Sequence, residues 1–141
     1  MKEIIFVDDF GAKGDGITDN TKAVNAAIAA AKDKNEPCEL RFSPNCSYYF
    51  APSGDEALKI TDIDGLAVTG CNTTILCDGC RPYMYINKTE NVHISGFNFD
   101  MKTRAHFVGT VVSVDKENLS AVFKADRKFE MEESVDINGD W

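Results

Sequence analysis

The sequence predicts an all-β fold that starts with one amphipathic helix and continues as a solenoid of short strands. A helical stripe of apolar residues is present between residues 21 and 32, and no second one follows. After Pro37, short apolar runs alternate with Gly, Asn, Asp and Pro. Part of this strand pattern recurs after 26 residues. Such a period, built from short strands, is typical of solenoid proteins.

The N-terminal segment reads as a strand, a turn and a helix. Residues 2–8 are apolar enough for a buried strand, and a glycine-rich turn from Gly11 to Gly16 follows. Thr18 or Asp19 can cap the helix, because either side chain can accept a hydrogen bond from a free backbone N–H. The apolar face of the helix is expected to comprise Val24, Ala27, Ile28 and Ala31. The helix should end near Asn35–Pro37, where Pro disfavours its continuation.

The repeated strands fix the predicted architecture of the next segment. Leu58–Ile60, Leu66–Val68 and Gly70 have counterparts in Met84–Ile86, Val92–Ile94 and Gly96. In each copy a polar corner of five residues, 61–65 or 87–91, separates the strands. Units made only of strands at this period indicate a parallel β-helix, in which each coil buries its inward side chains against its neighbours.

A different pattern begins at Arg104. The runs Gly109–Asp115 and Leu119–Ala125 are longer and are joined by three polar residues, 116–118, which predicts an antiparallel hairpin. We therefore expect two regions. Residues 1–103 would form the cap helix and first coils, and residues 104–141 an incomplete antiparallel β insertion.

Charge and hydropathy exclude several classes of protein. The chain has 141 residues, 43% of them hydrophobic, and a formal net charge of -8. An acidic chain with no basic patch is a poor candidate for binding nucleic acid or an anionic membrane surface. No apolar run reaches the length of a membrane span, and no signal peptide precedes Ile4. The chain as written is expected to be cytoplasmic, or secreted if a signal has been removed.

The five cysteines favour plain reduced thiols. Cys77 and Cys80 have the C-x-x-C spacing of metal and redox sites. A zinc site needs four ligands, and neither a second C-x-x-C nor paired histidines accompany this one. The pair also stands in a turn and not at a helix start, where the thiol pKa would be lowered. We expect no metal and no cofactor.

The stretch FGAKGDGITDNTKAV, residues 10–24, nearly matches a phosphate-binding P-loop. It has the strand, the two glycines, a threonine and the helix, but Ile17 stands where the phosphate-binding lysine is required. Asp15 and Asp19 would also repel a bound anion. A tight connection between strand and helix, with Gly16 at positive φ, is the favoured interpretation.

Residues 7–24, VDDFGAKGDGITDNTKAV, resemble the N-terminal signature of the pectate-lyase-like superfamily. Residues 86–100 resemble a coil of the same families. Residues 109–115 are similar to the start of a small β-barrel inserted in α-1,3-galactosidase-like glycoside hydrolases. The resemblance implies a right-handed parallel β-helix, closed at its N-terminal end by the capping helix and followed by a hairpin or partial inserted barrel.

The same resemblance places the family's catalytic carboxylates on later coils, beyond residue 141. Hydrolysis of a glycosidic bond needs two carboxyl groups that flank it. Asp8, Asp9, Asp62 and Asp64 are candidates by residue type, but turns or caps explain them as well. Asp100, Arg104 and His106 lie at the junction of coil and hairpin and are candidates for substrate binding. The alternative for these three is a polar linker. His93 alternates with apolar residues and should face outward.

Together these features predict the N-terminal part of a carbohydrate-active β-helix protein, a glycoside hydrolase. The stretch itself would be structural and inactive alone. It would contact carbohydrate through the parent protein and self-associate through the open end of the β-helix. The alternative is a non-catalytic binding or structural module, such as a piece of a tailspike-like adhesin, for which a discrete trimer in solution would be evidence.

Overall fold

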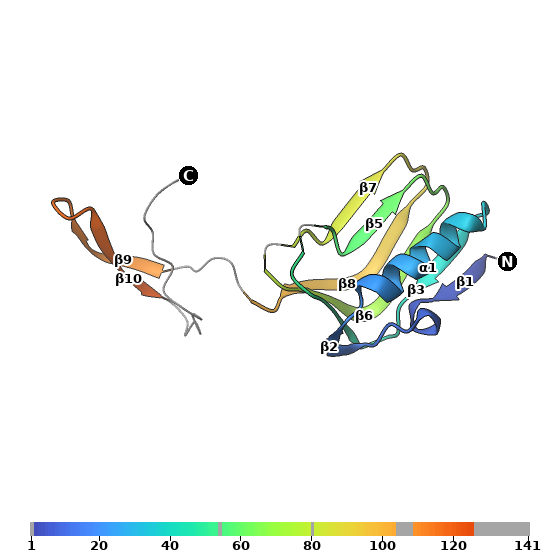
Figure 1. Cartoon of the computed structure of the whole chain (residues 1–141), viewed down its shortest axis with the longest axis horizontal. Coiled ribbons are helices and arrows are strands. Elements are labelled where there is room, and N and C mark those ends of the chain that lie inside the picture. The colour runs from blue at the N-terminus through green and yellow to red at the C-terminus, as the bar shows by residue number, and fades with distance from the viewer. Residues whose placement is uncertain (1, 54, 80, 104–108, 126–141) are drawn as a thin grey trace. The chain divides into compact units, whose positions relative to one another are not determined.

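The computed structural model of the chain is mostly strand, with one α-helix (Figure 1). It describes residues 2–53, 55–79, 81–103 and 109–125. The chain divides into two units, Met1–Arg104 and Ala105–Trp141. Neither unit, in its described residues, has a helix that is long and apolar enough to cross a membrane.

The first unit begins with β1 (Glu3–Phe6), a 3-10 turn η1 (Val7–Phe10), β2 (Asp15–Asp19) and α1 (Thr21–Asp33). The expected strand over residues 2–8 is therefore too long, because the chain turns at Val7. The expected turn up to Gly16 overlaps the start of β2. This strand pairs with β4 (Ser47–Phe50) in parallel only at its two ends, Asp15 with Ser47 and Asp19 with Tyr49, and its register is irregular between them, where Gly16 has positive φ.

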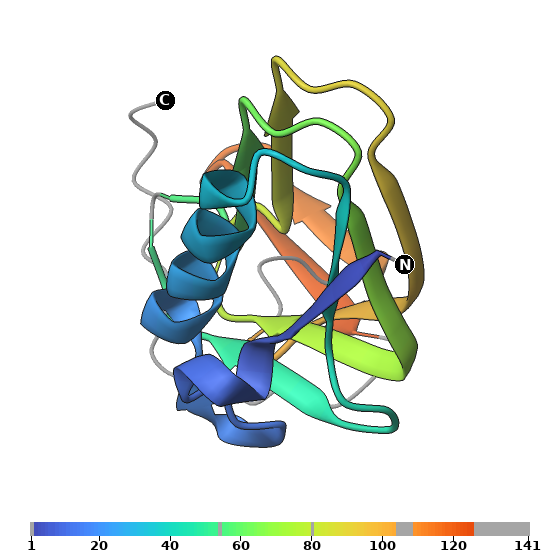
Figure 2. The same ribbon diagram turned by 90° about the vertical axis from the view of Figure 1, so that its right-hand side faces the viewer.

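Every strand pairing described in the first unit is parallel, and the pairings follow a repeating order. β3 (Cys38–Arg41), β4 and β5 (Leu58–Thr61) make one turn of the chain. β6 (Ala67–Cys77) and β7 (Met84–Asn87) make the next, and β8 (His93–Met101) begins a third. β6 pairs with β3 and β4 on one side and with β8 on the other, while β5 pairs with β7. The sheet curls around a core, with α1 along one side (Figure 2).

The predicted repeat is confirmed in register. Leu58 lies opposite Met84, Ile60 opposite Ile86, and Val68 opposite Ile94. The runs expected at 66–68 and 74–76 do not form separate strands, because β6 continues through the bend between them. At that bend, Gly96 packs so close to the backbone of Gly70 that a Cβ on Gly96 would collide with the Gly70 carbonyl oxygen.

Asparagine side chains connect successive turns at this bend. Asn45 and Asn72 both have left-handed backbones, with φ of 55° and 53°. Asn is among the residues that tolerate this conformation best. The Asn72 Nδ2 donates to Asn45 Oδ1 at 3.0 Å, and the Asn98 Nδ2 donates to Asn72 Oδ1 at 3.2 Å. Each amide therefore satisfies the one in the turn before it.

The core lies between the curled sheet and the helix. The inward residues of the middle strands are buried, among them Leu40, Tyr48, Phe50, Ile60 and Ile75. All four residues predicted for the apolar face of α1 are buried as well. The helix packs against η1, β1, β3 and β5. The N-cap position is Asn20, but the expected capping bond comes from Asp19, whose Oδ1 accepts the Thr21 N–H at 3.1 Å, while Asn20 makes no side-chain cap bond.

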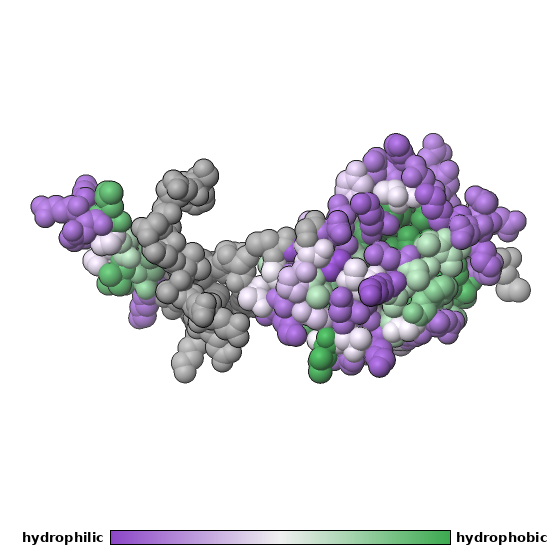
Figure 3. Space-filling view, in the orientation of Figure 1, coloured by the Kyte–Doolittle hydropathy of each residue, from purple (hydrophilic) through white to green (hydrophobic). Residues whose placement is uncertain are grey.

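The last turn of the first unit is less covered than the turns before it. Ile86 is 45% exposed and Phe99 46% exposed, whereas their partners in the preceding turn, Ile60 and Ile75, are 0% exposed. Hydrophobic residues show between hydrophilic ones on the surface of this unit (Figure 3). The core is thus open on the side of β7 and β8.

The described part of the second unit is a hairpin. β9 (Gly109–Asp115) and β10 (Ser120–Ala125) pair antiparallel, with an irregularity between Val122 and Phe123. This confirms the predicted hairpin. Asp115 Oδ1 accepts the backbone N–H groups of Glu117 and Asn118 in the connection.

Candidate functional site

The outward face of β4, β6 and β8 carries a row of side chains that could meet a ligand. Tyr49 pairs with Leu76, and Leu76 pairs with Asp100. Their neighbours along the strands, Tyr48 and Ile75, point inward and are buried. Because successive residues of a strand face opposite sides, the row Tyr49, Leu76 and Asp100 faces outward.

Beyond this row, the ends of the strands bring together a cluster of polar groups. We define this junction cluster as Tyr49, Asp78, Lys102 and Thr103. The Tyr49 hydroxyl donates to Asp78 Oδ2 at 3.0 Å. The Lys102 Nζ lies 4.2 Å from the centroid of the Tyr49 ring, within the range of a cation–π contact. The Lys102 backbone N–H bonds to the Cys77 carbonyl at 2.8 Å, which continues the ladder of β8.

The Asp78 carboxyl is held in its ionised form. A hydrogen bond from the Thr103 side chain contributes most, and bonds from Tyr49 and the Gly79 N–H add to it. Together they outweigh partial burial and keep the pKa of Asp78 below its ordinary value of 3.8. Burial, followed by the bond to Asp78, raises the pKa of Tyr49.

These protonation states suit binding better than acid catalysis. A general acid must be protonated at the working pH, and Asp78 is ionised there. An aromatic ring, an ammonium group and a carboxylate on an open strand face can instead bind the hydroxyl groups and apolar face of a sugar.

The described residues include part of the predicted site. Asp100 is exposed on β8, and its Oδ1 accepts the Met101 N–H at 2.8 Å. Arg104 and His106 lie outside the described residues, so their proposed role stays a prediction. The sequence reasoning missed Tyr49, Asp78 and Lys102. Two signals were available: Tyr49 alternates with buried aromatic residues, and Lys102 stands two positions after Asp100.

The other candidate carboxylates have structural partners or lie apart from the cluster. Asp8 accepts hydrogen bonds from the Tyr48 hydroxyl at 2.6 Å and the Ser43 hydroxyl at 2.5 Å. Burial, followed by the bond to Asp8, raises the pKa of Tyr48 to about 12. Asp8 thus connects η1 to β4 and to the loop that precedes β4. Asp9 is exposed on η1, and His93 is exposed on β8 as expected.

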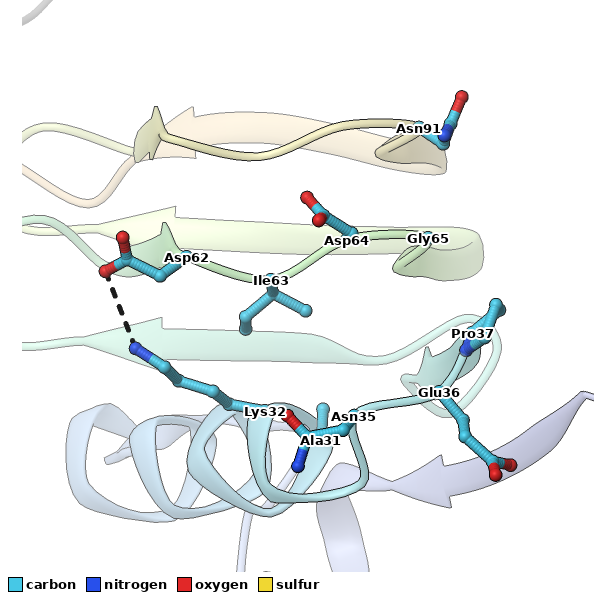
Figure 4. Close-up of a pocket in the computed structure, with 10 residues that line it drawn as sticks. All are labelled: Ala31, Lys32, Asn35, Glu36, Pro37, Asp62, Ile63, Asp64, Gly65 and Asn91. Carbon is cyan, nitrogen blue, oxygen red and sulfur yellow. Dashed lines mark ion pairs between the residues drawn. The ribbon is translucent and has the colours of Figure 1, made fainter.

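Asp62 and Asp64 lie at a pocket of about 300 Å³ between the C-terminal end of α1 and the corner after β5 (Figure 4). Asp62 forms an ion pair with Lys32, with 3.5 Å between its Oδ2 and the Nζ. Asp64 Oδ1 accepts the Glu90 N–H at 2.7 Å and so joins two successive corners. The pocket is lined by Ala31, Lys32, Asn35, Glu36, Pro37, Asp62, Ile63, Asp64, Gly65 and Asn91.

The glycine-rich stretch has a structural organisation. Gly16 has φ of 71°, as expected. Asp15 Oδ1 accepts the backbone N–H groups of Ile17 at 2.9 Å and Thr18 at 2.8 Å, and its Oδ2 accepts the Thr18 hydroxyl. The carboxylate of Asp15 thus occupies N–H groups of the kind that hold phosphate in a P-loop. This gives a physical reason for the expectation that the stretch binds no nucleotide.

Asn20 is the polar centre of that stretch. It is fully buried, and its Nδ2 donates to the carbonyls of Lys13, Thr18 and Tyr49. Its Oδ1 accepts the Lys13 N–H at 2.6 Å. One side chain therefore fixes the loop before the helix to β4.

Cys38 and Cys77 have the buried environment of structural cysteines. Cys38, Cys46, Cys71 and Cys77 are free. Burial raises the pKa of Cys77 to about 11, which makes its thiolate scarce at neutral pH. Cys80, its partner in the C-x-x-C spacing, is outside the described residues. Within residues 2–53, 55–79, 81–103 and 109–125, no three His, Cys, Asp or Glu side chains are placed to hold a metal ion.

Comparison with known families agrees with the resemblance at the N-terminus. Residues 4–51 match the family model described as rhamnogalacturonase A/epimerase, pectate lyase-like. The match covers all but the first residue of β1, and the whole of η1, β2, α1, β3 and β4. It confirms the pectate-lyase-like resemblance for this N-terminal portion. A search of curated proteins found no match.

Proposed function

We propose that this chain is the N-terminal part of a carbohydrate-active protein, a glycoside hydrolase acting on a glycan or polysaccharide. In this proposal residues 1–103 are the capped start of a right-handed parallel β-helix, with α1 as the cap. Their own role is structural, and catalytic carboxylates lie on later coils. A carbohydrate ligand meets this chain along the outward strand face that includes the junction cluster.

Two observations together support the proposal: the family match at the N-terminus and the repeating order in which the parallel strands pair. The match supplies the class, pectate lyase-like, over residues 4–51. The pairings continue the same order through β5, β6, β7 and β8, beyond the matched residues. A stack of parallel turns that extends past the matched segment is the behaviour expected of a β-helix.

The exposure of the last turn supports the proposal that more coils follow. Ile86 and Phe99 face the side where their counterparts are fully buried, yet each keeps more than two fifths of its surface exposed. A further coil would cover both, as β7 and β8 cover Ile60 and Ile75. In the absence of that coil, we expect the same end to mediate self-association.

A comparison of two proteins tests the proposal. One is the 141-residue chain, and the other is the product of the same gene with all residues encoded after Trp141. Both are incubated with pectic polysaccharides, rhamnogalacturonan among them, and newly formed reducing ends are measured. We expect the longer product to release reducing ends and the 141-residue chain to release none. A stop codon directly after Trp141, or hydrolysis by the short chain, would overturn the proposal.

A further inference from the structure

We propose that the pocket between α1 and the corner after β5 binds one neutral sugar unit. This inference goes beyond the proposed function, because the pocket is formed by other residues than the junction cluster and needs no later coil. It rests on the shape, the polar lining, the charge and the rigidity of the pocket.

The shape of the pocket suits a ligand of about the size of a monosaccharide. Its volume of about 300 Å³ is at the lower end of the usual range for small-molecule sites. Pro37 is exposed and gives the pocket an apolar part, whereas Ala31 and Ile63 also line it but are only 2% and 6% exposed. In Figure 4, Ile63 points from the corner toward α1. A sugar ring has a patch of C–H groups that can cover such a surface.

The polar lining offers both donors and acceptors. Asn35 and Asn91 contribute amides, which donate and accept, and Lys32 contributes an ammonium group. Asp64 uses Oδ1 for the Glu90 N–H, while its Oδ2 has no partner in the described part of the chain. A hydroxyl group both donates and accepts one hydrogen bond or more. A lining of this mixed kind therefore matches a polyhydroxylated ligand.

Charge selects a neutral ligand over an anionic one. Lys32 is the only cation among the lining residues, and it is paired with Asp62. The carboxylate of Asp62 beside it offsets part of the positive charge that a uronate, a sulfate or a phosphate would meet. The carboxylate of Asp64 adds repulsion toward such groups. Glu36 points away from the corner in Figure 4 and contributes less.

The corner that forms one wall is rigid before any ligand arrives. Asp62 has φ of 54° and Gly65 φ of 70°. The Asp62 N–H bonds to the Asn87 carbonyl at 3.2 Å, and the Gly65 N–H bonds to the Glu90 carbonyl at 2.8 Å. These bonds connect the corner to the next turn of the chain. A wall held in this way loses little conformational entropy on binding, which favours even a small ligand.

Titration with three related sugars tests the proposal. The full chain is titrated with galactose, galacturonate and galactosamine, and binding is followed by chemical-shift changes of Ile63 and Asp64. We expect galactose to bind with a dissociation constant in the millimolar range and galacturonate to bind roughly tenfold more weakly. Binding of galactosamine with no binding of galactose would show a cation site and overturn the proposal. No binding of any sugar would overturn it too.

A charge-changing variant makes the test sharper. Asp62→Asn keeps the left-handed backbone, which Asn tolerates, and frees the Lys32 ammonium. We expect the preference to shift toward galacturonate by roughly tenfold. The matched control is Asp9→Asn, which removes one exposed carboxylate outside the pocket and should leave the preference unchanged. An unchanged preference in folded Asp62→Asn would contradict the proposed ligand position. Thermal melting establishes that both variants are folded.

Discussion

Asn20 shows how one buried polar side chain can decide the local structure of a loop. Its amide makes hydrogen bonds to Lys13, Thr18 and Tyr49, and its burial is complete. The glycines around it provide the backbone shapes, since Gly16 has positive φ and a Cβ on Gly14 would come within 2.4 Å of the Cys46 Cβ. The near match to a P-loop therefore has a structural cause.

Replacing Asn20 with Ala should lower the free energy of unfolding by about 2–4 kcal/mol, because several buried backbone groups lose their partner. Denaturant unfolding measures this change. Asn25→Ala, an exposed position on the same helix, is the matched control and should change stability by less than about 0.5 kcal/mol. Equal, small effects in both variants would show that the Asn20 amide does not hold the loop.

Asp15 should make stability depend on pH in acid solution. Hydrogen bonds from Thr18, first from its backbone and then from its side chain, lower the pKa of Asp15 to about 2 from its ordinary 3.8. Because the folded pKa is the lower one, the stabilisation is fully present above pH 3.8 and is lost as the pH falls toward about 2.

Urea midpoints at pH 5 and pH 2.5 would detect this contribution. Other carboxyl groups of the chain also have lowered pKa values, so the native protein is compared with Asp15→Asn. The variant should lose less stability between the two pH values than the native chain does. A loss of equal size would mean that the hydrogen bonds to Asp15 do not favour its ionised form.

At the scale of elements, α1 illustrates what the sequence can predict. Its period, its apolar face and its end were predictable, because the helical stripe is a local pattern. The N-cap was not, because Asn20 is placed by hydrogen bonds to Tyr49, which lies far along the sequence. β2 was missed for a similar reason: its sequence DGITD has no strand pattern, and its extended form depends on pairing with β4.

The buried face of α1 gives a direct test of its packing. Val24→Asp should destabilise the chain by about 3–5 kcal/mol, because an unpaired charge would be placed in a fully buried position. Ala26→Asp, on the exposed face of the same helix, is the control for lower helix propensity. The melting temperature of each variant measures the effect. If the Val24→Asp and Ala26→Asp variants have the same melting temperature, the helix does not cover the core.

The candidate site was predictable only in part, again because its residues are far apart in the sequence. Asp100 was chosen from its place at the end of a repeat. The contacts of Tyr49 with Asp78 and Lys102 join positions from successive turns of the chain. The local sequence around each residue contains no pattern that predicts these contacts. The pocket likewise combines the end of α1 with two corners. Its Asp62 and Asp64 were recognised as corner residues without the cavity beside them.

At the scale of the whole first unit, successive turns of the chain differ in how far their inward residues are buried. α1, η1 and β1 pack at one end, while the inward residues of β7 and β8 remain partly exposed at the other. A strand that pairs on one side leaves half of its backbone groups to solvent. The inward residues of β3 and β4 are therefore better covered than those of β7 and β8.

Residue-resolved hydrogen exchange tests this central claim most directly. It is measured on the 141-residue chain and on the longer product that the proposed function requires. In the short chain, amides of β3, β4 and β6 should exchange slowly, and those amides of β8 that do not bond to β6 should exchange fast. In the longer product the same β8 amides should become as slow as those of β6. Full protection of β8 in the short chain, or fast exchange of β8 in both proteins, would contradict the account.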